Sequence, residues 1–187
     1  DPRLSGDETV SCWTCHLLEE GGDDNVPVSS GVEGLQGSRN APTVFNSVWN
    51  FRQFWDGRAV TLEEQVDGPI HTAHEMGSSW SLIVKRLTAL PHYVKLFQEI
   101  YDDEVRPAHV RDALAEYQRS LITPNARFDQ YLRGDAQAIS AQEKEGYRLF
   151  KEYGCASCHQ GVNAGGNMFQ AIGVMREFID APALNKS

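Results

Sequence analysis

Residues 154–161 read GCASCHQG, and this stretch decides the fold together with CWTCH at residues 12–16. Both contain Cys-x-x-Cys-His, the attachment signature of c-type haem. The spacing suits the chemistry, because two thiols add to the haem vinyl groups and the next residue, histidine, ligates the iron. We therefore predict two covalently bound c-type haems. The residues that would hold them are Cys12, Cys15, His16, Cys155, Cys158 and His159.

Two other uses of a Cys-x-x-Cys pair fit this sequence less well. Pairs that share one zinc ion are usually about 15–20 residues apart, whereas Cys15 and Cys155 are 140 positions apart. A thioredoxin-like redox pair needs a βαβ context, and no alternating strand pattern flanks either motif. All four cysteines fall in the two motifs, which favours haem attachment for both.

Composition and charge exclude other classes. The formal net charge of −9 argues against nucleic-acid binding, which needs a basic face. The sequence contains no run of about 18 apolar residues, so it predicts no transmembrane helix. The chain opens on DPRLSGDETV, without the basic and apolar regions of a signal peptide. Because c-type haem is attached outside the cytoplasm, we expect a periplasmic protein whose N-terminus has been processed or clipped.

Apolar periodicity and capping residues predict an all-α fold. Thr61 and Ser140 each open a capping box, with glutamate three residues on. We expect helices over 61–66, over 81–90, from Pro91, from Pro107 and over 141–153, and a helical turn over 128–132. Asp67-Gly68-Pro69 is expected to end the first helix. The side chains expected to be buried on the last three long helices are Tyr93, Val94, Phe97, Ile100, Val110, Leu114, Tyr117, Leu121, Tyr147, Leu149 and Phe150.

The order of these segments predicts two haem domains. A helix that runs directly into CASCH is typical of the start of a cytochrome c domain, and the Gly-, Asp- and Ser-rich residues 17–50 predict a long ordered loop packed on a haem. We expect two cytochrome c-like domains, residues 1–133 and an incomplete second domain at 134–187. No comparable helix precedes CWTCH, so the chain is expected to be clipped at both ends.

The sequence resembles the bacterial dihaem cytochrome c peroxidases over nearly its whole length. The similar segments follow the order of the family: DPRLSGD (1–7), GSRNAPTVFN (37–46), FWDGRAVTLEEQ (54–65), GPIHTAHEM (68–76), LITPNARFDQYLRG (121–134) and CASCHQGVNAGG (155–166). The resemblance implies reduction of hydrogen peroxide to water, with electrons from a small soluble donor, a cytochrome c or a cupredoxin. It is compatible with a homodimer.

The resemblance also implies roles for single residues. His16 would ligate the peroxidatic haem iron, Glu75 would act as acid and base, and Gln65 would hold the peroxide. Without the resemblance, Gln65 could be an exposed helix residue and Glu75 a solvated loop charge. What favours the catalytic interpretation is the spacing EQ-x9-EM, with GPI expected as a turn between them.

Three further residues follow from the resemblance. Trp55 would lie between the haems and carry electrons, although a tryptophan beside Phe54 also suits core packing. Arg58 could neutralise a haem propionate or pair with Asp56. Asn40 matches a residue that helps to bind calcium, an ion that needs six to eight oxygen ligands.

The sequence departs from the family where axial ligands are concerned. Many members have a histidine in the loop after the first motif, but none occurs from residue 17 to residue 70. Either the first iron is already open in the resting protein or another side chain serves as its ligand, with His71 and His74 the nearest candidates in sequence. The interpretation favoured for His71 and His74 is surface or outer histidines beside Glu75, and for His92 and His109 solvated side chains. Met168 and Met175 are interpreted as packing residues, because the axial methionine of the second haem lies further on in the family.

Two other functions remain open from the sequence. One is a dihaem electron-transfer protein without peroxidase chemistry, in which the first iron would stay six-coordinate in every redox state. The other is a related dihaem oxidase that matures a tryptophan-derived quinone cofactor. Its distinguishing tyrosine ligand to the second haem would lie beyond residue 187.

Overall fold

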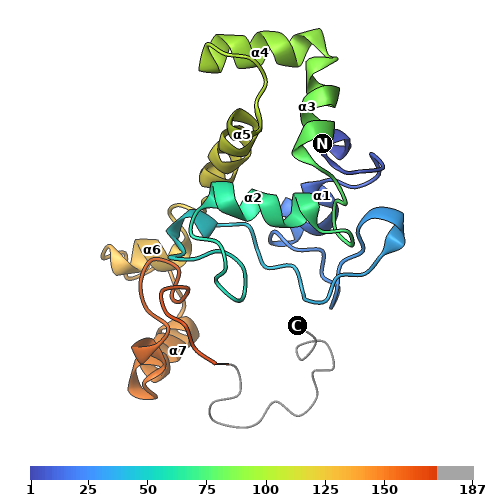
Figure 1. Ribbon diagram of the computed structural model, residues 1–187. Coiled ribbons are helices and arrows are strands. Elements are labelled where there is room, and N and C mark those ends of the chain that lie inside the picture. Colours follow the sequence, from blue (N-terminus) through green and yellow to red (C-terminus); the bar gives the residue numbers. More distant parts are fainter. Residues whose placement is uncertain (172–187) are drawn as a thin grey trace.

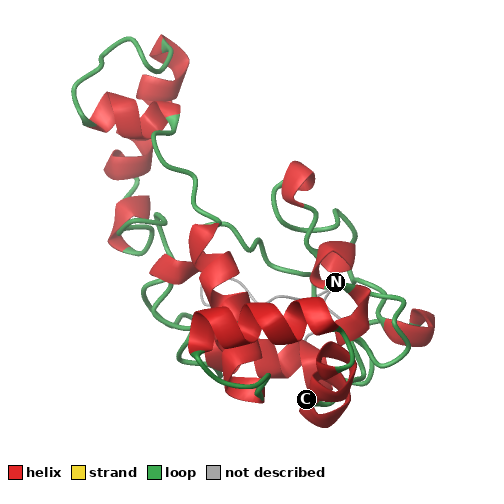
Figure 2. Cartoon of the chain, turned by 90° about the horizontal axis from the view of Figure 1, so that it is seen from above, coloured by secondary structure: helices red, strands yellow, loops and turns green. Residues whose placement is uncertain are grey.

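The computed structural model describes residues 1–171, and these residues form helices and loops without a named strand (Figures 1 and 2). The long helices are α2 (Leu62–His71), α3 (Trp80–Thr88), α4 (Pro91–Tyr101), α5 (Pro107–Ser120) and α7 (Ala141–Glu152). The short helices α1 (Cys12–Cys15) and α6 (Arg127–Leu132) complete the set. The all-α prediction is confirmed. None of the helices in residues 1–171 is both long and apolar enough to span a membrane.

Local sequence signals explain where the helices begin. The hydroxyls of Thr61, Ser79 and Ser140 accept hydrogen bonds from the first turns of α2, α3 and α7. Pro91 and Pro107 occupy the first positions of α4 and α5, where a missing N–H costs nothing. The predicted starts were therefore within one residue of the observed ones.

The predicted end of the first helix was wrong. α2 continues through Asp67-Gly68-Pro69 to His71. Proline has no N–H, so Pro69 removes the hydrogen bond to the carbonyl of Gln65, four residues earlier. The helix nevertheless resumes, since Thr72 donates to the carbonyl of Gly68 at 3.1 Å. GPI is therefore helical and is not the expected turn.

Asp67 joins three helices of the first structural unit, residues 1–123. Its Oδ1 accepts hydrogen bonds from Trp80 Nε1 of α3 at 2.7 Å and from Arg111 Nε of α5 at 2.9 Å. Arg111 also stacks over the ring of Trp80, with its guanidinium carbon 4.5 Å from the ring centre. These contacts hold α2 against α3 and α5. The core between them contains Val66, Ile70, Ile83, Leu87, Phe97 and Val110.

α6 and α7 lie to one side of α3–α5 and pack on each other (Figures 1 and 2). The ring of Phe128 in α6 meets that of Tyr147 in α7 edge to face at 5.0 Å. Arg127 pairs with Glu143 at 2.6 Å. We call residues 127–169 the second unit.

Several side chains expected to be buried are not. Val94 and Ile100 of α4 are 39% and 70% exposed, and Tyr117 of α5 is 54% exposed. No residue of α7 is buried, so Tyr147, Leu149 and Phe150 are only half-buried. Periodicity identifies the apolar face of a helix but not how completely a neighbouring element covers it.

Candidate functional site

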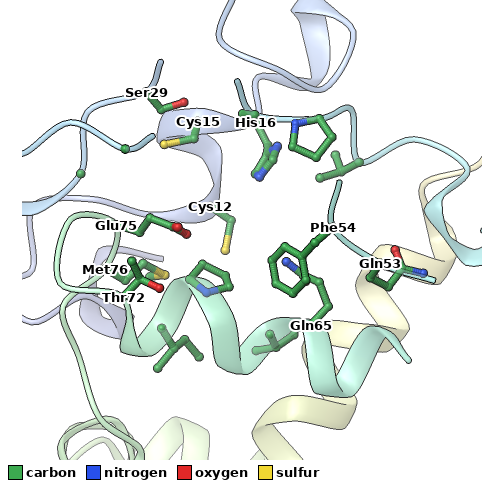
Figure 3. A pocket seen from close by; sticks show the side chains of 18 of the residues that line it. Cys12, Cys15, His16, Ser29, Gln53, Phe54, Gln65, Thr72, Glu75 and Met76 are labelled. Carbon is green, nitrogen blue, oxygen red and sulfur yellow. The ribbon is translucent and has the colours of Figure 1, made fainter. Parts of the chain in front are cut away.

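A cavity of about 510 Å³ opens between α1, α2, residues 37–44 and α5 (Figure 3). Cavities of about 300–1,000 Å³ are typical of ligand sites. Much of the wall is apolar, with contributions from Leu4, Val10, Leu18, Val44, Phe54, Val66, Ile70, Met76, Leu114 and Leu121. Three of the four residues expected to be buried in the helix from Pro107, namely Leu114, Tyr117 and Leu121, thus line a cavity that could hold a large, mainly apolar group.

α1 places the first Cys-x-x-Cys-His motif on the cavity wall. The Ser11 N–H donates to Thr14 Oγ1 at 3.0 Å, and the Thr14 N–H donates to the Ser11 carbonyl at 2.9 Å, which closes one helical turn. Cys12, Cys15 and His16 all line the cavity. Removal from water raises the pKa of both thiols, so they stay protonated at neutral pH.

The ring of His16 is oriented as a metal ligand would be. Its Nδ1 lies 3.0 Å from the carbonyl of Gly22, and because a carbonyl only accepts, Nδ1 carries the proton. Nε2 is then free to bind a metal, the arrangement usual for ligating histidines. Figure 3 shows the ring directed into the cavity. Gly22 is required, because a Cβ there would lie 2.8 Å from Thr43 Oγ1 and 3.0 Å from Val44 N. The first motif therefore fits a haem.

Gln65 and Glu75 face this same cavity (Figure 3). Gln65 projects from α2, and Glu75 from the loop that folds back over the end of that helix. Met76 N donates to Pro69 O at 3.1 Å and Ser78 N to Ile70 O at 2.8 Å, which fixes the loop. The structure thus brings the two predicted residues together in front of the first motif.

Burial raises the pKa of Glu75 above its ordinary value. A smaller electrostatic effect of the nearby basic groups His74, Arg58 and His16 opposes this rise. Glu75 is half-buried, so the description of it as a solvated loop charge is wrong. A carboxyl group with a raised pKa is suited to exchange protons near neutral pH.

Residues 29–37 hold Glu75 from the other side. The Val32 N–H donates to the Glu75 carbonyl at 2.9 Å. A Cβ on Gly31 would lie 2.3 Å from the carbonyl oxygen of His74 and 2.4 Å from that of Glu75. The sequence did not predict this contact. Its one trace in the sequence is a glycine in a long ordered loop, where another segment can approach the backbone closely.

The FWDGR segment forms another part of the wall. Arg58 pairs with Asp56 at 2.9 Å, and its guanidinium carbon lies 3.5 Å from the ring centre of Phe54. Phe54 has a φ of +67°, uncommon outside glycine, and its ring fills the space above Gly68 of α2. Trp55 is 61% exposed, so it is not a core residue. Its Nε1 donates to the backbone carbonyl of Asn40 at 2.9 Å.

Asn40 lies beside Trp55 but not in a metal site of side chains. Its Nδ2 donates to the carbonyl of Val26 at 2.8 Å. Among residues 1–171, no group of three or more His, Cys, Asp or Glu side chains could hold a metal ion. The calcium prediction therefore stays a prediction.

The other histidines differ in their surroundings. His74 lines the cavity, whereas His71 is exposed and lies 3.9 Å from Asp67. His92 is exposed. His109 was expected to be solvated, but its ring stacks on Tyr101 at 4.4 Å and its Nδ1 contacts the carbonyl of Glu104 at 2.9 Å. Those partners become neighbours only when α4 and α5 turn back on each other.

The second motif repeats the local geometry of the first. His159 N donates to Cys155 O at 2.9 Å, and His159 Nδ1 lies 3.2 Å from Ala164 O, which again leaves Nε2 as the free nitrogen. Cys155, Cys158 and His159 are all exposed, whereas in the first motif Cys12 is exposed and Cys15 and His16 are half-buried. Met168 is 44% exposed, so its packing is incomplete, and Met175 lies outside the described residues.

Comparisons with known proteins agree on one family. The profile of the di-haem cytochrome c peroxidases matches residues 1–137. Cytochrome c peroxidase Ccp of Escherichia coli is 48% identical over 95% of this chain and 38% of its own length. Cytochrome c551 peroxidase of Pseudomonas aeruginosa is 43% identical over 95% of this chain and 52% of its own length. The chain thus spans about half or less of these relatives.

A solved structure extends this similarity to the fold. A MauG-like protein associated with microbial copper homeostasis superposes with a TM-score of 0.81. It is 34% identical in sequence, and the match covers 88% of this chain and 50% of that protein.

Proposed function

The chain belongs to the di-haem cytochrome c peroxidase family, and from this premise we propose that the protein reduces hydrogen peroxide to water. In the overall reaction, H₂O₂, two protons and two electrons give two molecules of water. The electrons would come from a small redox protein, a cytochrome c or a cupredoxin, in the periplasm. One observation carries the proposal: Glu75 and Gln65 face the cavity that Cys12, Cys15 and His16 line.

The residues present fit two covalently held haems. Cys12 and Cys15 would form the thioethers of the first haem and His16 Nε2 would ligate its iron, while Cys155, Cys158 and His159 would hold the second. When bound, the haems would supply the electron-transfer chemistry that side chains lack. Arg58, beside the cavity, is placed to offset propionate charge. The domain division at 133/134 remains a proposal, and the contacts of α6 with α7 favour a boundary before Arg127.

Glu75 would move the protons. Cleavage of the O–O bond needs a proton to leave one peroxide oxygen and a proton to reach the other, which departs as water. The Glu75 carboxylate would accept the first proton and then return it to the departing oxygen. Burial supports this role, because it raises the pKa of Glu75 toward the working pH. The Gln65 side-chain amide would hold the peroxide by hydrogen bonds in the same cavity.

Electrons would enter at the His159 site and pass to the His16 site by way of Trp55. This route is supported by the position of Trp55 on the wall of both cavities, the one that the first motif lines and the one that Gly166, Met168 and Phe169 border. Calcium near Asn40 and a homodimer are further proposals. The similarity to a MauG-like protein keeps the quinone-maturing oxidase as a second candidate.

The test is peroxide turnover by the haem-loaded protein and its Glu75→Gln variant, followed by stopped-flow absorbance with a reduced donor. We expect the variant to keep both haems but to lose about 10²–10⁴-fold in turnover, the usual contribution of one acid–base group. Glu33→Gln is the matched control, because Glu33 is an exposed carboxyl group. Unchanged turnover in Glu75→Gln would refute the role of Glu75. No turnover by the wild type would refute the peroxidase proposal.

A further inference from the structure

The side chain of Asn163, in the loop after the second haem motif, forms hydrogen bonds to the first unit. Asn163 Nδ2 donates to the carbonyl of Asn46 at 3.0 Å and to Asn50 Oδ1 at 2.8 Å. Asn163 is half-buried, although the residues on either side of it are exposed. These partners are more than 110 positions away in the sequence. An ordinary solvated loop asparagine would not direct both donor contacts into another structural unit.

Backbone contacts surround this side chain. Phe51 N donates to Gly166 O at 3.3 Å, and the rings of Phe51 and Phe169 meet edge to face at 5.0 Å. A Cβ on Gly166 would lie 2.5 Å from Asn50 Oδ1. Ala164, Gly165 and Gly166 all have positive φ, an arrangement that costs free energy for Ala164. The contacts to the first unit offset that cost.

The receiving turn is itself fixed to the first unit. Asn46 and Asn50 flank the 3₁₀ turn Ser47–Trp49. The side chain of Asn46 donates to Thr123 Oγ1 at 2.8 Å and accepts from Thr123 N at 3.0 Å. The turn therefore offers a rigid surface rather than a mobile loop.

The candidate ligand His159 is linked to Asn163 through one intervening residue, Ala164. His159 Nδ1 contacts the carbonyl of Ala164, and Ala164 follows Asn163 directly. Gly166, Met168 and Phe169 also border a second cavity of about 280 Å³. Its wall shares Ser47, Gln53, Phe54 and Trp55 with the first cavity. A shift of the loop would thus move His159 relative to the wall between the two cavities.

We infer that Asn163 is a positioning residue: it fixes the His159 site against the wall that contains Trp55, and so sets how fast electrons pass between the two haem sites. In each transfer one electron leaves the reduced group held by His159, which is oxidised, and reduces the group held by His16. The redox-protein donor replaces that electron. This inference rests on the proposed function, and it adds Asn163 to the residues that determine electron transfer from the His159 site to the His16 site.

Two variants of the haem-loaded protein test it. Asn163→Ala removes the side chain, and Asn163→Asp keeps its shape but removes both donors. Electron transfer is followed by reducing the second site with a one-electron pulse and recording its reoxidation. We expect both variants to slow this transfer about tenfold. Asn167→Ala is the control, because Asn167 is exposed and lies in the same loop.

Amide hydrogen exchange gives a readout that does not depend on activity. The amide of Phe51 should exchange about tenfold faster in both Asn163 variants, and at the wild-type rate in Asn167→Ala. Wild-type electron transfer in either Asn163 variant would overturn the inference, even if hydrogen exchange changed. The reaction of the fully reduced protein with peroxide should be unaffected. Failure of that reaction in the wild type would refute the peroxidase proposal, while the electron-transfer and exchange measurements would still decide on Asn163.

Discussion

Glu75 is subject to two opposing effects. Burial raises its pKa, while a smaller electrostatic effect of the basic groups His74, Arg58 and His16 lowers it. Because burial prevails, ionised Glu75 costs folding free energy as the pH rises from its ordinary pKa of 4.5 through the raised value. Glu75→Gln should therefore be at least as stable as the wild type at pH 7, and its loss of turnover would not reflect unfolding.

The raised pKa also predicts a pH dependence. Glu75 must be ionised to accept the first proton of peroxide, so kcat/KM should fall as the pH falls through its pKa. The acid limb should lie above pH 4.5, the ordinary value. Steady-state kinetics between about pH 4 and pH 8 measure it. The acid limb should persist in Glu33→Gln and be absent from the residual activity of Glu75→Gln. An acid limb that remained in Glu75→Gln would belong to another titratable group.

The contact between residues 29–37 and the loop after α2 leaves no room for a side chain at Gly31. Gly31→Ala would place a Cβ within 2.6 Å of three backbone atoms of His74 and Glu75. Backbone cannot rotate away as a side chain can, so the loops must separate. We expect a loss of about 1–3 kcal/mol in the free energy of unfolding, as for other overpacked sites, and a loss of turnover through displacement of Glu75.

Urea unfolding of Gly31→Ala measures this effect, and Gly146→Ala is its control. A Cβ on Gly146 would meet no atom within 4 Å, and Gly146 lies inside α7. Alanine should therefore stabilise that helix by about 0.5–1 kcal/mol. Equal stability of the two variants would contradict the packing argument.

At the scale of the whole molecule, the described residues 1–171 form two structural units in contact, each with one haem motif. Thioether bonds survive denaturation, so the unfolded protein should retain two haems. Cys12→Ala with Cys15→Ala should leave one haem, and so should Cys155→Ala with Cys158→Ala. The mass of the denatured protein and its haem absorbance give the count. Two retained haems in either double variant would contradict covalent attachment at that motif.

The sequence by itself determined the haem motifs and the helix starts. Both depend on residues within one turn of each other: two thiols and a histidine in five residues, or a hydroxyl that accepts from an N–H three positions on. Such local patterns can be recognised without knowing which distant segments lie beside them. The resemblance to a family, carried by segments in order, supplied Gln65 and Glu75 as candidates.

Only the tertiary structure decided the surroundings of these residues. The burial that raises the pKa of Glu75 depends on Val32 and Gly31, more than 40 positions away. The course of α2 through Pro69, the exposure of Trp55 and the stacking of His109 on Tyr101 likewise depend on neighbours from other segments. The tie from Asn163 to Asn46 and Asn50 is the longest-range case. Burial and charge act through space, and sequence spacing does not record which distant segments become neighbours.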